Sequence, residues 1–230
     1  MRFSPHLKAR AITLCFLIGF GAPAPASPAA ESRNILATIV SSCLDINAPD
    51  YCKRCSAPRL ESPCAQNRDC TATTEVWKET AEYVVIRDLK MCGCAPGFVH
   101  GLVIPRARIT GIEDSKRPDT IWNIAWAAAG KRIAEEDAIA LVVNPCGLRT
   151  QDQLHVHIVR LQSNARKRFD AAKSVNVRNL DEVWIAAAKK ADDMKLQDYG
   201  VLVARNRDGS FLVLVNERSP EKLYTQGMCK

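Results

Sequence analysis

Short apolar runs, rich in β-branched residues and bounded by turn residues, recur along the chain after residue 77. Such runs are typical of β-strands. They predict strands at residues 83–89, 98–104, 138–143, 153–161, 199–204 and 211–216. The last two strands are joined by an R-N-R-D-G-S hairpin, in which Gly209 provides the positive φ that the turn needs.

Apolar positions at helical spacing predict the helices that connect these strands. Residues 115–134 carry such a stripe around Trp122 and Trp126, and residues 179–191 carry another. A basic segment at 164–172 is also predicted to be helical, as is a short stretch at 35–43. A helix placed between strand pairs with tight hairpins favours an α+β fold, with a sheet and helices on one face.

The first 26 residues have the pattern of a targeting segment. Arg2, Lys8 and Arg10 give a positive start, residues 11–22 are apolar, and small residues follow. About a dozen apolar residues are too few to span a bilayer but are sufficient for a secretory leader. Residues 1–26 are therefore expected to be a signal peptide, with a short N-terminal membrane anchor as the alternative. The protein is expected to be exported, either periplasmic or associated with the inner membrane.

Cysteine usage agrees with export. The chain has ten cysteines, and they are concentrated between residues 43 and 94. This density predicts a Cys-rich, disulfide-stapled extension at 27–75, ahead of a catalytic domain at 76–230. Zinc held by some of these cysteines is the alternative. Removal of a leader containing Cys15 leaves an odd number, so one thiol is free or intermolecular, with Cys146 and Cys229 as candidates.

Composition and charge limit the classes of binding partner that the protein is expected to have. An apolar fraction of 47% excludes a disordered chain. The net charge of +7 is spread without a basic block, and few aromatic residues are available for stacking, so a nucleic-acid partner is not indicated. A mild basic excess suits an anionic phosphate substrate or an anionic membrane surface.

Two histidines stand out in the strand at 153–161. Alternation along this strand places Gln153, His155 and His157 on one face, with Leu154, Val156 and Ile158 on the other face. Paired structural histidines and a metal site are the simpler interpretations of such a pair. His100, in an earlier strand, is interpreted as an ordinary strand residue because no neighbour in the sequence completes a site.

The loop before these histidines favours phosphate chemistry instead. Gly147, Arg149 and Thr150 offer backbone donors, a guanidinium group and a hydroxyl group, which are the components of a phosphate site. A neutral imidazole can attack phosphorus, while a second imidazole orients it or manages protons.

At this motif the sequence resembles the histidine triad (HIT) superfamily, whose signature is an Asn, a loop with Gly and Ser or Thr, and alternating histidines. The run VVNPCGLRTQDQLHVHI is most similar to the CDP-diacylglycerol pyrophosphatase branch. The stretches at 83–89, 104–113 and 199–216 also fit, so the resemblance covers residues 77–216. One departure is that Gln153 occupies the first triad position.

The resemblance implies a HIT-like antiparallel sheet with helices packed on it, and hydrolysis of CDP-diacylglycerol to CMP and phosphatidate. His155 would be the nucleophile that forms a cytidylyl-histidine, and His157 would bond a substrate oxygen. Gln153 would orient His155 through its amide group without titrating. The phosphate-binding residues implied are Asn144, Arg149, Thr150 and Gln151. No metal and no cofactor are required.

Two other functions are compatible with the sequence. An incomplete triad fits a nucleotide- or phospholipid-binding protein without catalysis, or a nucleotidyl transferase. A metal site built on His155, His157 and cysteines is the other possibility. The expected partners are CDP-diacylglycerol or a related nucleotide pyrophosphate, together with a membrane surface and without nucleic acid.

Overall fold

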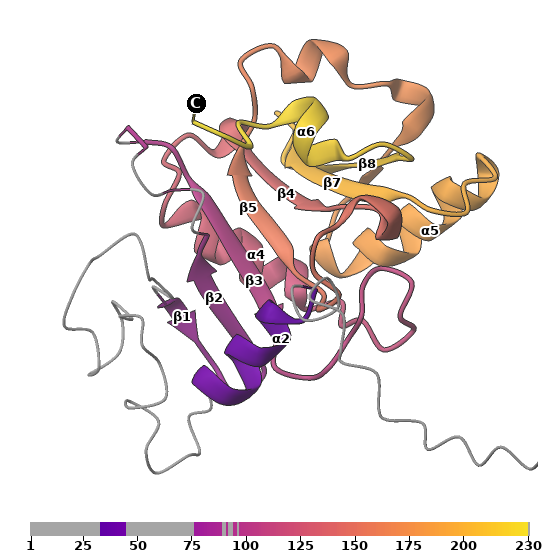
Figure 1. Ribbon diagram of the computed structural model, residues 1–230. Coiled ribbons are helices and arrows are strands. Elements are labelled where there is room, and N and C mark those ends of the chain that lie inside the picture. Colours follow the sequence, from indigo (N-terminus) through magenta and orange to yellow (C-terminus); the bar gives the residue numbers. More distant parts are fainter. Residues whose placement is uncertain (1–32, 45–75, 89–90, 92–93, 96, 230) are drawn as a thin grey trace, which may run out of the picture.

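The computed structural model describes residues 33–44, 76–88, 91, 94–95 and 97–229 (Figure 1). The predicted leader at 1–26 and most of the predicted extension at 27–75 lie outside the described residues. Within 33–44, the expected short helix is present as α2 (Ile35–Thr38), which continues in a wider helical turn at Ile39–Cys43. In the part of the chain that the structure describes, no helix is long and apolar enough to cross a membrane.

Eight strands form one antiparallel sheet in the order β1-β2-β3-β5-β4-β7-β8-β6. They are β1 (Val76–Glu79), β2 (Tyr83–Arg87), β3 (His100–Pro105), β4 (Ile139–Val143), β5 (Val156–Arg160), β6 (Ser174–Val177), β7 (Gly200–Arg205) and β8 (Phe211–Asn216). The six predicted strands are confirmed, and so is the α+β class. The two missed strands, β1 and β6, are four-residue edge strands whose patterns are too short to read.

Helices α4 (Ile121–Gly130) and α5 (Val183–Asp193) cover one face of the sheet. Trp122 and Trp184 are both buried, and their rings meet edge to face at 4.7 Å between centroids. The predicted helix at 115–134 begins only at Ile121. The preceding residues form turns, since Pro118 disfavours helix in the residue before it.

The remaining helical segments are short. The segment predicted as a helix at 164–172 contains only 3-10 turns, and its Arg166 side chain donates to main-chain carbonyls of Asp137 and Arg205 in other segments. The 3-10 turns lie at Glu136–Ala138, Cys146–Leu148, Ala165–Arg168, Ala171–Lys173 and Leu180–Glu182. A C-terminal helix, α6 (Pro220–Tyr224), was not predicted.

The second face of the sheet carries helices too, which the prediction of helices on one face missed. In Figure 1, α2 and α6 lie in front of the sheet and α4 lies behind it. On this front face, one apolar cluster packs beneath α2 and another beneath α6. Between the clusters, β3 and β5 carry His100 and His157, and His155 immediately precedes β5. The polar site therefore divides the apolar surface of this face into two.

Candidate active site

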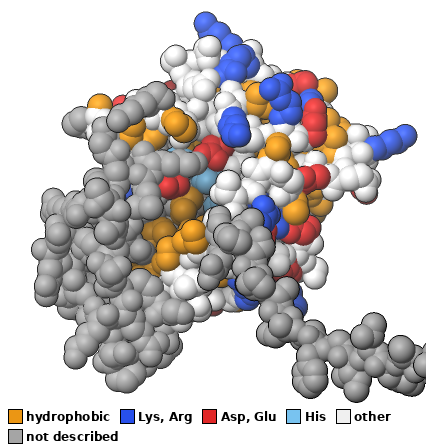
Figure 2. Space-filling model, viewed as in Figure 1, with side chains coloured by type: hydrophobic (Ala, Val, Ile, Leu, Met, Phe, Trp, Pro, Cys, Tyr) orange, Lys and Arg blue, Asp and Glu red, His pale blue; other side chains and the backbone are white. Residues whose placement is uncertain are grey.

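A cavity of about 1090 Å³ opens beside the histidines. Its walls come from the loop after β4, from the segment before β3, and from the C-terminal tail. In Figure 2, pale-blue histidine surface is visible beside carboxylate atoms near the centre of this face. The predicted site residues that line the cavity are Asn144, Arg149, Thr150, His155 and His157.

His155 is buried, with 8% of its surface exposed, at the end of the loop that leads into β5. Its Nδ1 lies 2.7 Å from the main-chain carbonyl oxygen of Gln153. A carbonyl oxygen only accepts, so Nδ1 carries the proton and Nε2 keeps a lone pair. Burial lowers the pKa of the His155 imidazole, against the opposing effect of that same hydrogen bond. His155 is thus held as a neutral imidazole whose Nε2 can accept a proton or a hydrogen bond.

His157 lies beside His155, with ring centroids 4.8 Å apart. Its Nδ1 is 3.0 Å from Nε2 of His100, a fully buried residue of β3. The interpretation of His100 as an ordinary strand residue was therefore wrong. The antiparallel register pairs His100 with Val159 and Leu102 with His157, so the two imidazoles are diagonal neighbours on one face. That register could not be read from the sequence.

Glu221 of α6 is a buried carboxylate that sequence reasoning missed. It accepts a 2.6 Å hydrogen bond from the amide nitrogen of Asn144. Its two oxygens lie 3.5 Å from Nε2 of His157 and 3.5 Å from Nε2 of His100. Ser219 donates to the amide oxygen of Asn144 at 2.7 Å, which fixes the amide orientation. Glu221 thus lies between the imidazoles of His157 and His100, and its charge also raises the pKa of His155.

Asp88 adds a second carboxylate, 3.5 Å from Nε2 of His100. Donor atoms of Asp88, His100 and His157 lie within 4.8 Å of one another, a spacing that a metal ion also fits. The two imidazole donors are engaged with each other at 3.0 Å, so metal binding would replace this hydrogen bond.

Gln153 is placed differently from the expectation. Its side chain is buried, and its amide nitrogen donates to the carbonyl oxygens of Pro105 and Ala107 at 2.9 and 2.8 Å. It does not line the cavity. The main-chain carbonyl, and not the expected amide group, bonds His155. The side chain at the first triad position thus links the motif to the end of β3 and the residues that follow it.

The loop donors expected to hold phosphate have protein partners. The guanidinium group of Arg149 makes a two-pronged ion pair with Glu113, at 2.7 and 2.6 Å. That partner raises the pKa of Arg149 further. The backbone N–H groups of Cys146 and Gly147 donate to the Asp198 carboxylate at 2.7 and 2.8 Å. The guanidinium group and both N–H groups are therefore already bonded to carboxylates of the protein before a substrate binds.

The two polar residues that follow Arg149, Thr150 and Gln151, differ in their surroundings. Thr150 is exposed and lines the cavity. The side chain of Gln151 accepts from the main-chain N–H of Leu36 in α2 at 3.0 Å and donates to the Thr150 carbonyl. Gln151 therefore links the loop to α2.

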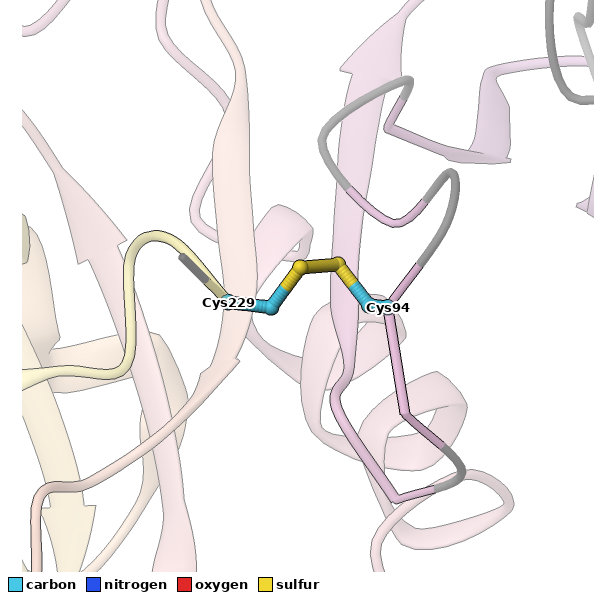
Figure 3. Close-up of a disulfide and its surroundings, with 2 residues drawn as sticks. All are labelled: Cys94 and Cys229. Carbon is cyan, nitrogen blue, oxygen red and sulfur yellow. A yellow bond between two sulfur atoms is a disulfide. The ribbon is translucent and has the colours of Figure 1, made fainter.

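A disulfide joins Cys94 to Cys229 across 135 positions of sequence (Figure 3). It attaches the tail to the segment before β3, and residues beside both cysteines line the cavity. Of the two candidates for a free thiol, Cys229 is paired and Cys146 is free and exposed. The tail is thereby fixed as a wall of the site.

Comparison with known protein families shows which family the chain belongs to. A family model described as CDP-diacylglycerol pyrophosphatase matches residues 54–185, which is more than half of the chain. The match includes His100, Asn144, His155 and His157, and it ends before α6 begins. The chain therefore belongs to the CDP-diacylglycerol pyrophosphatase family, whose activity is that of a hydrolase.

Proposed function

We propose that the protein hydrolyses CDP-diacylglycerol to CMP and phosphatidate through a cytidylyl group carried on Nε2 of His155. The observation that carries this proposal is the 2.7 Å bond between Nδ1 of His155 and the Gln153 carbonyl. That bond leaves the lone pair on Nε2, in a residue that lines the cavity. Family membership supports the substrate.

The chemistry divides into two displacements at the cytidylyl phosphorus. In the first, the lone pair of Nε2 forms a bond to phosphorus, and the bond to the bridging oxygen breaks, releasing phosphatidate with the electron pair. In the second, water attacks the same phosphorus and the P–N bond breaks, returning the electron pair to Nε2. One water is consumed, and CMP and phosphatidate are produced. Replacing one difficult displacement by two easier ones is the contribution of a nucleophilic histidine.

The residues around His157 manage protons in this scheme. His157 is adjacent to His155 and reaches a non-bridging or leaving oxygen of the substrate. A proton held between His157 and His100 is stabilised by the Glu221 carboxylate, 3.5 Å from each ring. The amide nitrogen of Asn144 donates to Glu221 and lies 3.4 Å from Nε2 of His157. Such a buried, charge-assisted network suits the neutralisation of an oxyanion leaving group.

The test uses CDP-diacylglycerol radiolabelled on the cytidylyl phosphate. Wild type is expected to acquire an acid-labile, base-stable label and to release CMP, because a phosphoramidate is sensitive to acid. His155→Ala should lose both, while circular dichroism and the Cys94–Cys229 disulfide show that its fold is intact. Gln153→Asn serves as a matched control, since it keeps the main-chain carbonyl that bonds His155.

Two other outcomes would contradict the mechanism. Release of CMP without any protein-bound label, from rapidly quenched samples, would indicate direct attack by water. Absence of both label and CMP, with CDP still bound, would favour a binding protein. Metal analysis of the purified protein tests the metal alternative at Asp88, His100 and His157.

Export and contact with a membrane surface are part of the same proposal. A Cys94–Cys229 disulfide fits an oxidising compartment such as the periplasm. Leu148 and Met228 are large apolar side chains exposed by 47% and 72%, and both border the cavity. Apolar side chains at the mouth of a lipid substrate's site are suited to insertion among acyl chains.

Vesicle sedimentation tests the membrane contact. Leu148→Ser and Met228→Ser are each expected to reduce binding to anionic vesicles that contain no CDP-diacylglycerol. Ile185→Ser is the matched control, because Ile185 is 73% exposed but lies on α5, behind the sheet. Equal loss in the control and the cavity variants would show that the mouth has no special part in membrane binding.

A further inference from the structure

The cations that line the cavity differ in their partners. Arg149 is paired with Glu113, and Arg160 donates to Glu135 at 2.9 Å. An ion pair that already exists must be broken or shared before its cation can bind an anionic ligand, which reduces the net gain. Neither arginine therefore offers a full positive charge to a diphosphate.

Lys222 of α6 is the exception. It is exposed and lines the cavity, and it has no acidic partner among the residues that the structure describes. Its backbone N–H is held by the hydroxyl oxygen of Ser219, which caps α6. The neighbouring Glu221 faces the histidines. Helix α6 thus brings a buried carboxylate and an uncompensated cation to one site.

The segment that carries Lys222 is fixed to the rest of the fold at three places. Ser219 bonds Asn144, at the end of β4. Thr225 forms a bridge with Leu161, just after β5. Cys229 is bonded to Cys94. A short helix held at both ends can present a side chain to the cavity with little loss of conformational entropy on binding.

We propose that Lys222 binds the diphosphate of the substrate, and that the C-terminal segment 219–229 is a wall of the substrate site. The choice of a nucleoside diphosphate as ligand rests on the proposed function. An ammonium group with three donors can contact oxygens of both phosphates, as lysine does in other phosphate sites. This segment lies beyond the residues that the family model matches, so the family match does not predict its role.

Calorimetric binding of CDP to the His155→Ala protein tests this role without turnover. In that background, Lys222→Ala is expected to weaken CDP binding roughly tenfold, the effect of one charge-assisted contact. Cytidine, which lacks phosphate, should bind equally to both proteins. Lys222→Arg should retain most of the affinity for CDP, since it keeps the charge. Lys189→Ala is the matched control, because this exposed lysine lies on α5, behind the sheet.

The outcomes separate this inference from the proposed function. If Lys222→Ala and Lys189→Ala bind CDP equally well, or if the parent protein does not bind CDP, the inference is overturned. If Lys222→Ala loses affinity for CDP while wild type neither carries label nor releases CMP, the proposed role of Lys222 in diphosphate binding is supported and the hydrolytic mechanism is rejected. A salt titration adds a second readout, since loss of a phosphate contact should reduce the dependence of CDP affinity on ionic strength.

Discussion

Gln153 and His155 are joined through the backbone, by a 2.7 Å hydrogen bond from Nδ1 of His155 to the Gln153 carbonyl. Every residue type has this carbonyl, so the tautomer of His155 does not depend on which side chain stands at position 153. The Gln153 amide group instead donates to Pro105 and Ala107. The absence of a histidine at the first triad position is therefore compatible with the proposed role of His155.

Gln153→His is expected to give no gain in the rate of hydrolysis and no shift of the pH profile, because this side chain lies outside the cavity. Gln153→Ala should lower the free energy of unfolding by about 1–3 kcal/mol, the cost of leaving buried carbonyls unbonded. Steady-state kinetics and denaturant unfolding measure the two effects. A faster Gln153→His enzyme with a new ionisation in its profile would contradict this placement.

The pH dependence of hydrolysis follows from the burial of His155. Burial lowers the pKa of this imidazole below its ordinary value of about 6.5. The proposed mechanism requires a neutral His155, so kcat/KM should stay high as the pH falls through 6.5 and decline only at lower pH. A profile of kcat/KM with a soluble CDP ester measures this limb. An acid limb above pH 6.5 would contradict the burial argument.

The same shift affects stability. The unfolded chain protonates His155 near its ordinary pKa of about 6.5, whereas the folded chain does so only at lower pH. Protonation therefore favours the unfolded state, and stability present above pH 6.5 is lost as the pH falls toward the lowered pKa. Denaturant unfolding of wild type and His155→Gln should show a smaller decrease in the variant between pH 7.5 and 5.

Loss of the Glu221 charge should reduce hydrolysis strongly. Glu221→Gln removes a carboxylate that lies 3.5 Å from both His157 and His100 and whose charge raises the pKa of His155, so the pKa of His155 should fall further. We expect kcat to drop roughly tenfold to a hundredfold, with a shift of its pH profile to lower pH. Glu217→Gln is the matched control, since Glu217 pairs with Lys173 outside the cavity. An unchanged pH profile would assign Glu221 a purely structural role.

The Cys94–Cys229 disulfide should support both stability and substrate binding. Closing a loop of 135 positions stabilises the fold by about 5 kcal/mol in the chain-entropy model, which is an upper value. The Cys94→Ser/Cys229→Ser protein should unfold at lower denaturant and bind CDP more weakly, because the tail wall is released. Cys146→Ser should match wild type. Equal CDP affinity in all three proteins would show that the wall holds without the disulfide.

Local patterns determined much of this protein. Short apolar runs rich in β-branched residues predicted the six central strands, since a sheet covered on both faces buries consecutive residues of each strand. Alternation along the predicted strand at 153–161 correctly placed Leu154, Val156 and Ile158 in the core and His155 and His157 on the opposite face. The motif N-P-C-G-L-R-T-Q-D-Q-L-H-V-H also identified the family, because its spacing is local.

Only the tertiary structure decided which groups share the site and which of its cations are paired with carboxylates. His100 joins His157 through strand register, and Glu221 reaches Asn144 across 77 positions through the docking of α6. Ion pairs formed by distant residues, such as Glu113 with Arg149, determine which cations still carry net charge toward the cavity. These relationships depend on pairing and packing between segments far apart in the chain, whereas hydrophobic periodicity describes only one segment at a time.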